Sequence, residues 1–273
     1  MSIHHDRGTG PTLLVLPGLA ATAGFLAEAV ADLAVDHRVV TVELPGHGRN
    51  TGGTASLATA AEDVHRTVEA LDLRDVTLLG WSLGATVAYG YLERFGAARA
   101  AGLVSVEQTP RLVGDDGWPY PAFGNLTTAA AGQFRQAIAA DYGAFADNLV
   151  RGSFAAGADP DPAVVADLIA QAGRCDPEAV GALLADAVAA DWRERISRLT
   201  VPTLLVHGAR SQVYPGAVGG WLADAIPGAR LETFDHSGHL PFIEERDRFT
   251  RTVREFVARV AAPARTPGSE ADG

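Results

Sequence analysis

The stretch VTLLGWSLGATVAYGYL, residues 76–92, constrains the fold more than any other part of the chain. It begins as a short apolar run typical of a buried strand, passes through Gly-Trp-Ser-Leu-Gly at residues 80–84, and continues as an apolar helical pattern to Phe95. Glycines on both sides of the serine allow a sharp turn in which strand and helix come close together. Such a turn lifts the hydroxyl of Ser82 above the sheet edge, near the positive end of the helix dipole. We therefore expect Ser82 to be a nucleophile rather than a serine that only caps the helix.

Short apolar runs recur along the chain and are separated, in its first half, by helical patterns. This alternation predicts an α/β fold with a mostly parallel, doubly wound sheet that is covered on both faces. The predicted strands are Thr12–Leu16, Arg38–Val42, Val76–Leu79, Gly102–Val106, Val201–Val206 and Arg230–Phe234, and the helices between them are Ala27–Leu33, Ala58–Leu71 and Ala85–Phe95.

The alternation stops between Glu107 and Val201, where no strand pattern occurs. A segment of this length is too long for a plain loop, so it predicts an inserted helical cap. We expect a core formed by residues 1–110 and 200–262, a cap formed by residues 111–199, and a disordered tail at 263–273. The predicted cap helices are Leu126–Ala140, Tyr142–Phe154, Pro162–Gly173 and Pro177–Ala190.

Composition excludes several classes of partner. The net charge is -11, which argues against nucleic acid or an anionic membrane as a partner. Apolar runs are too short to span a membrane, and a single cysteine, Cys175, fits a cytoplasmic location. The chain has no lysine, no Cys-x-x-Cys and no His-Glu-x-x-His, so we expect neither a metal site nor a cofactor. A small molecule is the expected substrate, and the sequence leaves a homodimer open.

Three further segments, with the serine turn, carry a family resemblance. GPTLLVLPGLAATAGF resembles the first strand and loop of the α/β-hydrolase fold superfamily, VVTVELPGHGRN resembles its Asp-x-Pro-Gly-His-Gly-x-Ser segment, and DHSGHLPFIEERDRF resembles its histidine segment. The chain is thus similar to capped serine esterases and haloperoxidase-like enzymes over nearly the whole core. The departures are Glu43, Asn50, and Pro17 in place of a usual histidine.

The resemblance implies the remaining site residues. The backbone N–H groups of Leu19 and Leu83 would form the oxyanion hole. His239 would be the base, and His236, three residues earlier, is its nearest rival. Trp81, Trp118, Tyr120, Phe123 and Tyr214 are the expected substrate-binding residues. Trp118, Tyr120 and Phe123 belong to the cap, where aromatic side chains gather and suggest an apolar pocket.

The catalytic acid is the exception. Relatives carry it in a Gly-x-x-Asp-x-x-x-Pro pattern, but the matching span HGARSQVYP has Ser211 at that position. No Asp or Glu occurs from Ile196 to Ala223. Glu107 ends the strand before the cap and lies 25 residues after Ser82. Because catalytic groups gather at the carboxyl ends of parallel strands, we expect the acid to have moved there.

Some haloalkane dehalogenases and cofactor-free dioxygenases keep their acid after the same strand. Asp115 and Asp116 are weaker substitutes, and Glu107 could instead cap a turn or pair with Arg111. The expected function is hydrolysis of a small or medium hydrophobic ester, lactone or thioester through an acyl-enzyme on Ser82. The alternatives are a cofactor-free dioxygenase, lyase or cyclase that uses the pair of His239 and the acid, and a non-catalytic ligand-binding protein.

Overall fold

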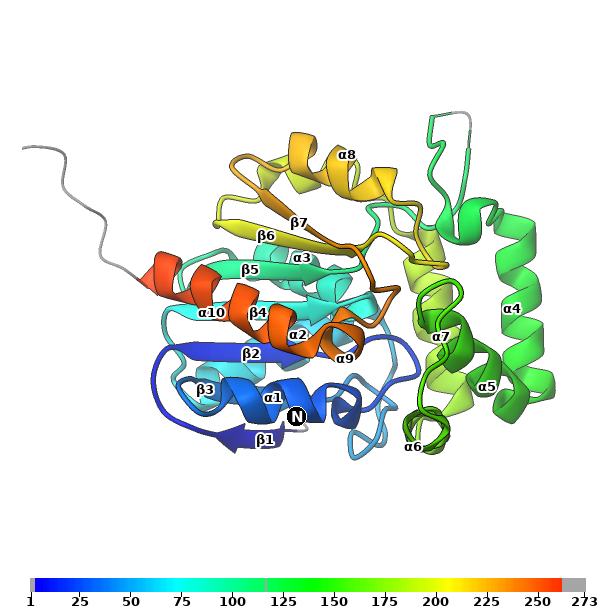
Figure 1. Cartoon of the computed structure of the whole chain (residues 1–273), viewed down its shortest axis with the longest axis horizontal. Helices are drawn as coiled ribbons and strands as arrows, with labels where there is room; N and C mark the ends of the chain where they lie inside the picture. The colour runs from blue at the N-terminus through cyan, green and yellow to red at the C-terminus, as the bar shows by residue number, and fades with distance from the viewer. Residues whose placement is uncertain (1–2, 116, 262–273) are drawn as a thin grey trace, which may run out of the picture.

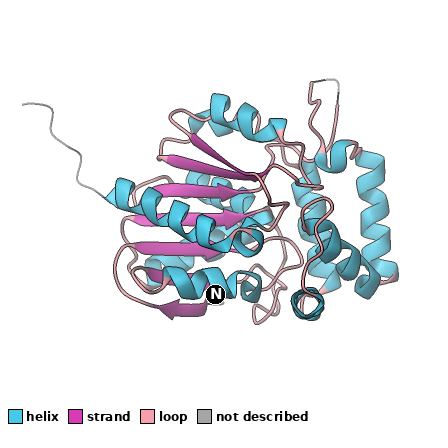
Figure 2. Ribbon diagram, in the orientation of Figure 1, coloured by secondary structure: helices cyan, strands magenta, loops and turns pink. Residues whose placement is uncertain are grey.

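The computed structural model describes residues 3–115 and 117–261, in which seven strands form one sheet in the order β1-β3-β2-β4-β5-β6-β7 (Figures 1 and 2). Strands β2 to β7 are parallel, and β1 pairs with β3 in the antiparallel direction. The predicted disordered tail and Asp116 lie outside the described residues. The strands are β1 (Ile3–Arg7), β2 (Thr12–Leu16), β3 (Arg38–Val42), β4 (Val76–Trp81), β5 (Ala100–Val106), β6 (Thr203–Gly208) and β7 (Arg230–Phe234).

Helices cover both faces of this sheet, because its central strands are apolar on both sides. On one face lie α2 (Leu57–Ala70), α3 (Leu83–Phe95) and α8 (Ala217–Ala225). On the other lie α1 (Ala27–Leu33), the short α9 (Pro241–Glu244) and α10 (Arg246–Ala261). Among the described residues, every helix is too short or too polar to cross a lipid bilayer. The predicted α/β architecture with a doubly wound sheet is confirmed.

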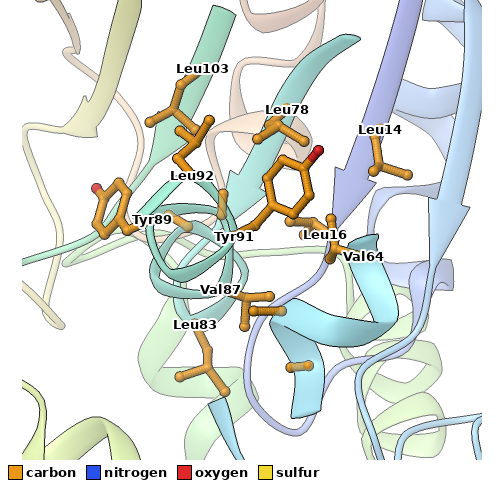
Figure 3. Close-up of a cluster of buried hydrophobic side chains, with 14 of the residues drawn as sticks. Leu14, Leu16, Val64, Leu78, Leu83, Val87, Tyr89, Tyr91, Leu92 and Leu103 are labelled. Carbon is orange, nitrogen blue, oxygen red and sulfur yellow. The ribbon is translucent and has the colours of Figure 1, made fainter. Parts of the chain in front are cut away.

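Helix α3 is buried on nearly all sides, which fixes the serine turn at its start. Figure 3 shows its side chains Leu83, Val87 and Tyr89 among apolar residues of the sheet and of α2. The Tyr89 hydroxyl lies 2.5 Å from Ser105 Oγ of β5, so a polar contact also ties this helix to the sheet. Dense packing of this kind leaves the helix little freedom to shift.

Four helices form a separate layer beyond the carboxyl ends of the strands (Figure 1). They are α4 (Thr128–Ala140), α5 (Tyr142–Ser153), α6 (Pro162–Ala172) and α7 (Pro177–Ala189), and each begins and ends within two residues of its predicted bounds. Asp161 and Asp176 accept hydrogen bonds from the first-turn N–H groups of α6 and α7, and each is followed by a proline. These caps explain why the sequence located both helices closely.

The sequence missed the edge strand β1 and the helices α8 and α10. Strand β1 reads IHHDR and is only half-buried, so it lacks the apolar run that marked the other strands. Strand β6 begins at Thr203, two residues after the predicted start at Val201. Pro202 explains this shift, because it has no N–H to give to the ladder, although its carbonyl accepts a hydrogen bond from Leu103.

Candidate active site

Ser82 occupies a strained turn between β4 and α3. Its backbone has φ 52° and ψ -123°, in the left-handed half of conformational space that non-glycine residues seldom adopt. The two flanking glycines are required by close approach: a Cβ on Gly80 would lie 2.5 Å from the backbone of Ala85, and one on Gly84 would lie 2.1 Å from the carbonyl oxygen of Leu16. The turn therefore depends on both glycines, as its sequence predicts.

Gln108 supports this turn from the neighbouring strand end. Its Nε2 donates hydrogen bonds to the carbonyl oxygen of Ser82 at 2.6 Å and to Thr86 Oγ1 at 2.8 Å. Sequence reasoning missed this residue. Its only signal was its position directly after Glu107.

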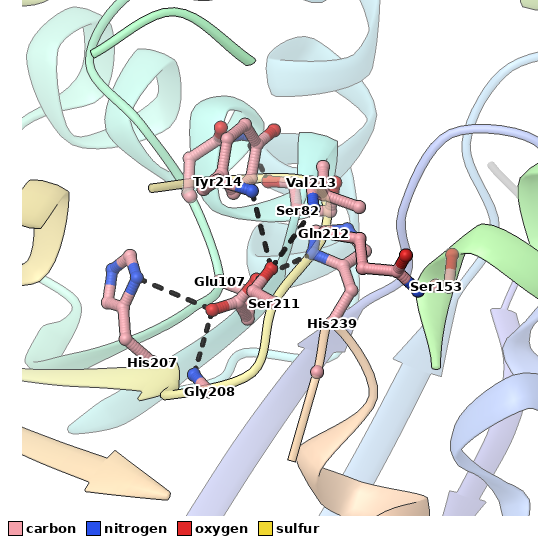
Figure 4. Close-up of polar contacts among 12 residues, drawn as sticks. Ser82, Glu107, Ser153, His207, Gly208, Ser211, Gln212, Val213, Tyr214 and His239 are labelled. Atoms are coloured by element: carbon pink, nitrogen blue, oxygen red, sulfur yellow. Dashed lines mark hydrogen bonds and ion pairs between the residues drawn. The ribbon is translucent and has the colours of Figure 1, made fainter. Parts of the chain in front are cut away.

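Glu107 directly follows β5 and is fully buried at the centre of a polar network (Figure 4). Like Ser82, it has a positive φ, 48°. Its Oε1 accepts a 2.8 Å hydrogen bond from the Gly208 N–H and lies 3.4 Å from His207 Nδ1. Its Oε2 accepts a 2.7 Å hydrogen bond from Ser211 Oγ and lies 2.9 Å from His239 Nδ1.

Two opposing effects set the charge of this carboxylate. Burial favours the neutral acid and raises the pKa of Glu107, but the hydrogen bonds from His207 and His239 outweigh it and lower the pKa to about 2. Glu107 is therefore ionised at neutral pH, as an acid that orients an imidazole and stabilises its charged form must be. Arg111 does not contact it and instead pairs with Asp115 and Asp191.

His239 is buried and fixed by contacts from three directions. The backbone N–H of His239 donates to the carbonyl oxygen of Ser153 at 2.8 Å, and its backbone carbonyl accepts a 2.8 Å hydrogen bond from Trp81 Nε1. The ring of Tyr214 meets its imidazole edge to face, with centroids 5.4 Å apart. The rival His236 is exposed, and its backbone N–H donates to Glu245 Oε2. The structure therefore brings His239, and not His236, to Glu107.

The loop expected to supply an oxyanion donor passes directly over Ser82. A Cβ on Gly18 would lie 3.2 Å from Ser82 Cβ, and Leu19 and Leu83 both line the cavity described below. His47 braces this loop: its Nε2 accepts a 3.0 Å hydrogen bond from the Ala20 N–H.

The protonation of His47 matches this bracing role. Its Nδ1 lies 3.0 Å from the carbonyl oxygen of Pro45, to which it donates, so the ring is neutral with its proton on Nδ1. Burial lowers the pKa of His47 to about 4, although the hydrogen bond to Pro45 acts in the opposite direction. Pro17 lacks the bracing side chain that relatives carry in this loop, and His47 provides support from a neighbouring segment.

A cavity of about 110 Å³ opens at Ser82 and His239, between the sheet edge and the cap. Its walls are mainly apolar and come from the core and from residues of α4, α5 and α7. Large side chains in the lining include Phe25, Phe123, Phe134, Phe145, Trp192 and Tyr214.

Comparison with known proteins places this geometry in a family. A sequence profile described as "alpha/beta hydrolase fold" matches residues 11–246, which is most of the chain. The chain belongs to the alpha/beta hydrolase fold family. The α/β-hydrolase fold and the hydrolase class that the sequence predicts are thereby confirmed.

Individual relatives of this hydrolase cover nearly all of its length. It is 29% identical over 250 residues to a pimeloyl-[acyl-carrier protein] methyl ester esterase of Chromobacterium violaceum, covering 92% of this chain and 95% of the relative. A protein of the same name from Xanthomonas oryzae pv. oryzae is 29% identical over 260 residues and matches 93% and 97% of the two chains. Among solved structures, an esterase from Exiguobacterium antarcticum superimposes with a TM-score of 0.87 at 25% identity, covering 93% and 94%.

The hydrolase differs from expectation at two of the five predicted substrate-binding residues. Trp81, Phe123 and Tyr214 line the cavity, but Trp118 and Tyr120 are not part of its wall. Trp118 is 2% exposed and packs edge to face on Tyr120 and on Trp221 of α8. Trp118 and Tyr120 therefore pack the start of the cap onto the core. Their positions in the sequence alone do not predict this packing.

Tyr214 lies closer to the reacting groups than a general pocket residue would. Burial raises the pKa of its hydroxyl well above the ordinary value, and the neighbouring Ser82 side chain partly offsets that rise. The phenol is therefore neutral at ordinary pH and presents an O–H group beside the nucleophile (Figure 4).

Proposed function

We propose that this chain is a serine hydrolase that cleaves a small or medium-sized hydrophobic carboxylic ester, lactone or thioester. One observation carries the proposal: the buried, ionised Glu107 contacts Nδ1 of His239 at 2.9 Å, and His239 lines the same cavity as Ser82. A carboxylate on Nδ1 leaves Nε2 of the imidazole free to accept a proton, which is what a serine nucleophile requires.

The chemistry follows from these positions. His239 removes the proton from Ser82 Oγ as that oxygen attacks the carbonyl carbon, and the N–H groups of Leu19 and Leu83 bind the resulting oxyanion. The protonated imidazole then gives its proton to the leaving alcohol or thiol. Water, deprotonated by the same imidazole, attacks the acyl-enzyme and releases the acid, which regenerates Ser82.

Features of the cavity support a hydrophobic acyl group. Its wall is mainly apolar, and several polar side chains in it already have partners within the protein. Gln108 binds Ser82 and Thr86, and Ser153 donates to the carbonyl oxygen of Leu149. A polar substrate group would lose water there without gaining a free partner.

Negative charge on the cap favours a free ester over one attached to any carrier protein that is itself negatively charged. Residues 128–189, which contain α4 to α7, carry eight Asp and Glu residues against three Arg. Like charges on two surfaces suppress their association. The named relatives act on a carrier-bound methyl ester, and we propose that this chain takes its ester as a free small molecule.

A fluorophosphonate probe and a series of p-nitrophenyl esters of increasing acyl length test the proposal. We expect labelling at Ser82, turnover that is best for short or medium acyl groups, and loss of both in Ser82→Ala. Absence of labelling in the unaltered protein would exclude an activated serine. Labelling without turnover of any ester would instead favour the lyase, cyclase or dioxygenase alternatives.

A further inference from the structure

A second histidine contacts the carboxylate that orients His239. His207 lies near the end of β6, and its Nδ1 is 3.4 Å from Oε1 of Glu107. His239 contacts the other oxygen, Oε2, at 2.9 Å, so the carboxylate lies between two imidazoles (Figure 4). Only 2% of His207 is exposed, and it does not line the cavity. This ring therefore does not reach a substrate and can act only through Glu107.

Packing fixes the orientation of the His207 ring. Helix α8 crosses it so closely that a Cβ on Gly219 would lie 3.3 Å from both Cγ and Cδ2 of the imidazole. The other ring nitrogen, Nε2, is buried without a hydrogen-bond partner among the described residues. Nδ1 is thus the polar atom of the ring that has a partner, and that partner is Glu107.

His207 provides a second polar contact on this side of the carboxylate, beside the Gly208 N–H. A buried ionised group is costly unless both of its oxygens are satisfied. Oε2 accepts hydrogen bonds from Ser211 Oγ and His239 Nδ1. Among the described residues, Oε1 contacts only the Gly208 N–H besides His207. A carboxylate free to rotate about its last bond would lose the alignment of Oε2 with His239.

We infer that His207 is a positioning residue, whose Nδ1–H is directed at Oε1 of Glu107 and holds Oε2 toward His239. The inference rests on the proposed function, because its consequence is the rate of the serine reaction. The charged and titratable groups that act on Glu107 are the two histidines, with Tyr214 and Glu244 also within electrostatic range. Neither Tyr214 nor Glu244 contacts Oε1, so neither replaces His207.

Two substitutions separate positioning from packing. His207→Asn keeps an N–H near the place of Nδ1, whereas His207→Leu fills similar space without a donor. We expect the leucine variant to lose about 10- to 100-fold in kcat on a p-nitrophenyl ester with KM changed by less than about twofold. The asparagine variant should recover most of that loss. Equal kcat in the leucine variant and the unaltered protein, or no recovery with asparagine, would overturn the inference.

A spectroscopic measurement tests the same point without turnover. A hydrogen bond between an imidazole N–H and a carboxylate gives a proton resonance far downfield in the NMR spectrum. We expect the His239 resonance in the unaltered protein and in His207→Asn, and its loss or upfield movement in His207→Leu. An unchanged resonance in the folded leucine variant would overturn the inference. If the unaltered protein shows the resonance but hydrolyses no ester, the proposed function fails while the positioning role is still tested.

Two glycines of α8 provide a matched pair of variants that leave His207 in place. Gly219→Ala pushes a methyl group toward the imidazole and toward Leu231, whereas Gly220→Ala adds its methyl group to open space. We expect kcat to fall in the first variant and to remain unchanged in the second. Unchanged kcat in both would count against a role for the orientation of His207.

Discussion

Ser211 Oγ donates a 2.7 Å hydrogen bond to Oε2 of Glu107, the carboxylate oxygen that lies 2.9 Å from His239 Nδ1. Ser211 stands at the position where the family resemblance predicts a catalytic aspartate. The same hydroxyl accepts hydrogen bonds from the N–H groups of Val213 and Tyr214, both at 3.3 Å. The usual position of the acid has thus become a support for a carboxylate that reaches the same histidine from the neighbouring strand.

This relationship predicts a rescue. Glu107→Gln should lose most ester turnover. The double variant Glu107→Gln with Ser211→Asp should hydrolyse the ester at least about tenfold faster than Glu107→Gln alone, because an aspartate at 211 starts from the position of the usual acid. Steady-state kcat on a p-nitrophenyl ester measures this. Ser211→Asp alone should be impaired, because two carboxylates would then share one site. A double variant no faster than Glu107→Gln would show that position 211 cannot reach the histidine.

Tyr214→Phe tests the hydroxyl beside the nucleophile. The substitution removes a polar group that acts on the Ser82 side chain but keeps the ring that packs on His239. We expect a fall in kcat/KM of about 3- to 10-fold, the size typical of one neutral hydrogen bond. Thermal unfolding should change little. Unaltered kinetics would mean that the phenol serves only as part of the apolar wall.

His47 predicts a loss of stability in acid. Its pKa is about 4 in the folded chain and 6.5 in an unfolded one, so the unfolded chain binds more protons between these values. The contribution of neutral His47 to the free energy of unfolding is therefore complete above pH 6.5. It decreases by on the order of 3 kcal/mol as the pH falls toward 4. Urea unfolding at several pH values should show this slope in the unaltered protein and a weaker slope in His47→Gln. Identical dependence of stability on pH in the two proteins would contradict the lowered pKa of His47.

Gly84→Ala should disrupt the serine turn. The added Cβ would lie 2.1 Å from the carbonyl oxygen of Leu16, a backbone atom that cannot move without displacing β2. We expect the free energy of unfolding to fall by more than about 2 kcal/mol, or the protein not to fold. Gly90→Ala in the same helix is the control, since its nearest neighbour would be the Cβ of Ala61 at 3.8 Å. Equal stability of the two variants would refute the argument from close approach.

The sequence allowed the core of the fold to be predicted because strong local signals marked it. Apolar runs located six strands, and aspartate-proline pairs located α6 and α7. The half-buried strand β1 has no such signal, and it exists because its backbone pairs with β3. Glu107 could be proposed from chain order, since parallel strands end at one edge.

Contacts between distant segments could not be read in the same way. Gln108 and Ser211 support the site through hydrogen bonds across strand ends, and His207 contacts Glu107 in the same region. Only the folded chain shows which atoms meet. The aromatic character of Trp118 and Tyr120 and their position in the cap predict pocket residues. In the structure the Trp118 ring instead packs edge to face on Tyr120 and on Trp221 of α8.

Pre-steady-state acylation tests most directly whether Glu107 is the catalytic acid. Rapid mixing with a p-nitrophenyl ester would measure the burst of p-nitrophenol that accompanies acylation of Ser82, in the unaltered protein, in Glu107→Gln and in Asp115→Asn. Asp115 is the control because it is a carboxylate near the cap entrance that pairs with Arg111. We predict a burst that slows by about 10³- to 10⁴-fold in Glu107→Gln and is unchanged in Asp115→Asn. A burst of normal rate in Glu107→Gln would contradict the assignment of Glu107 as the catalytic acid.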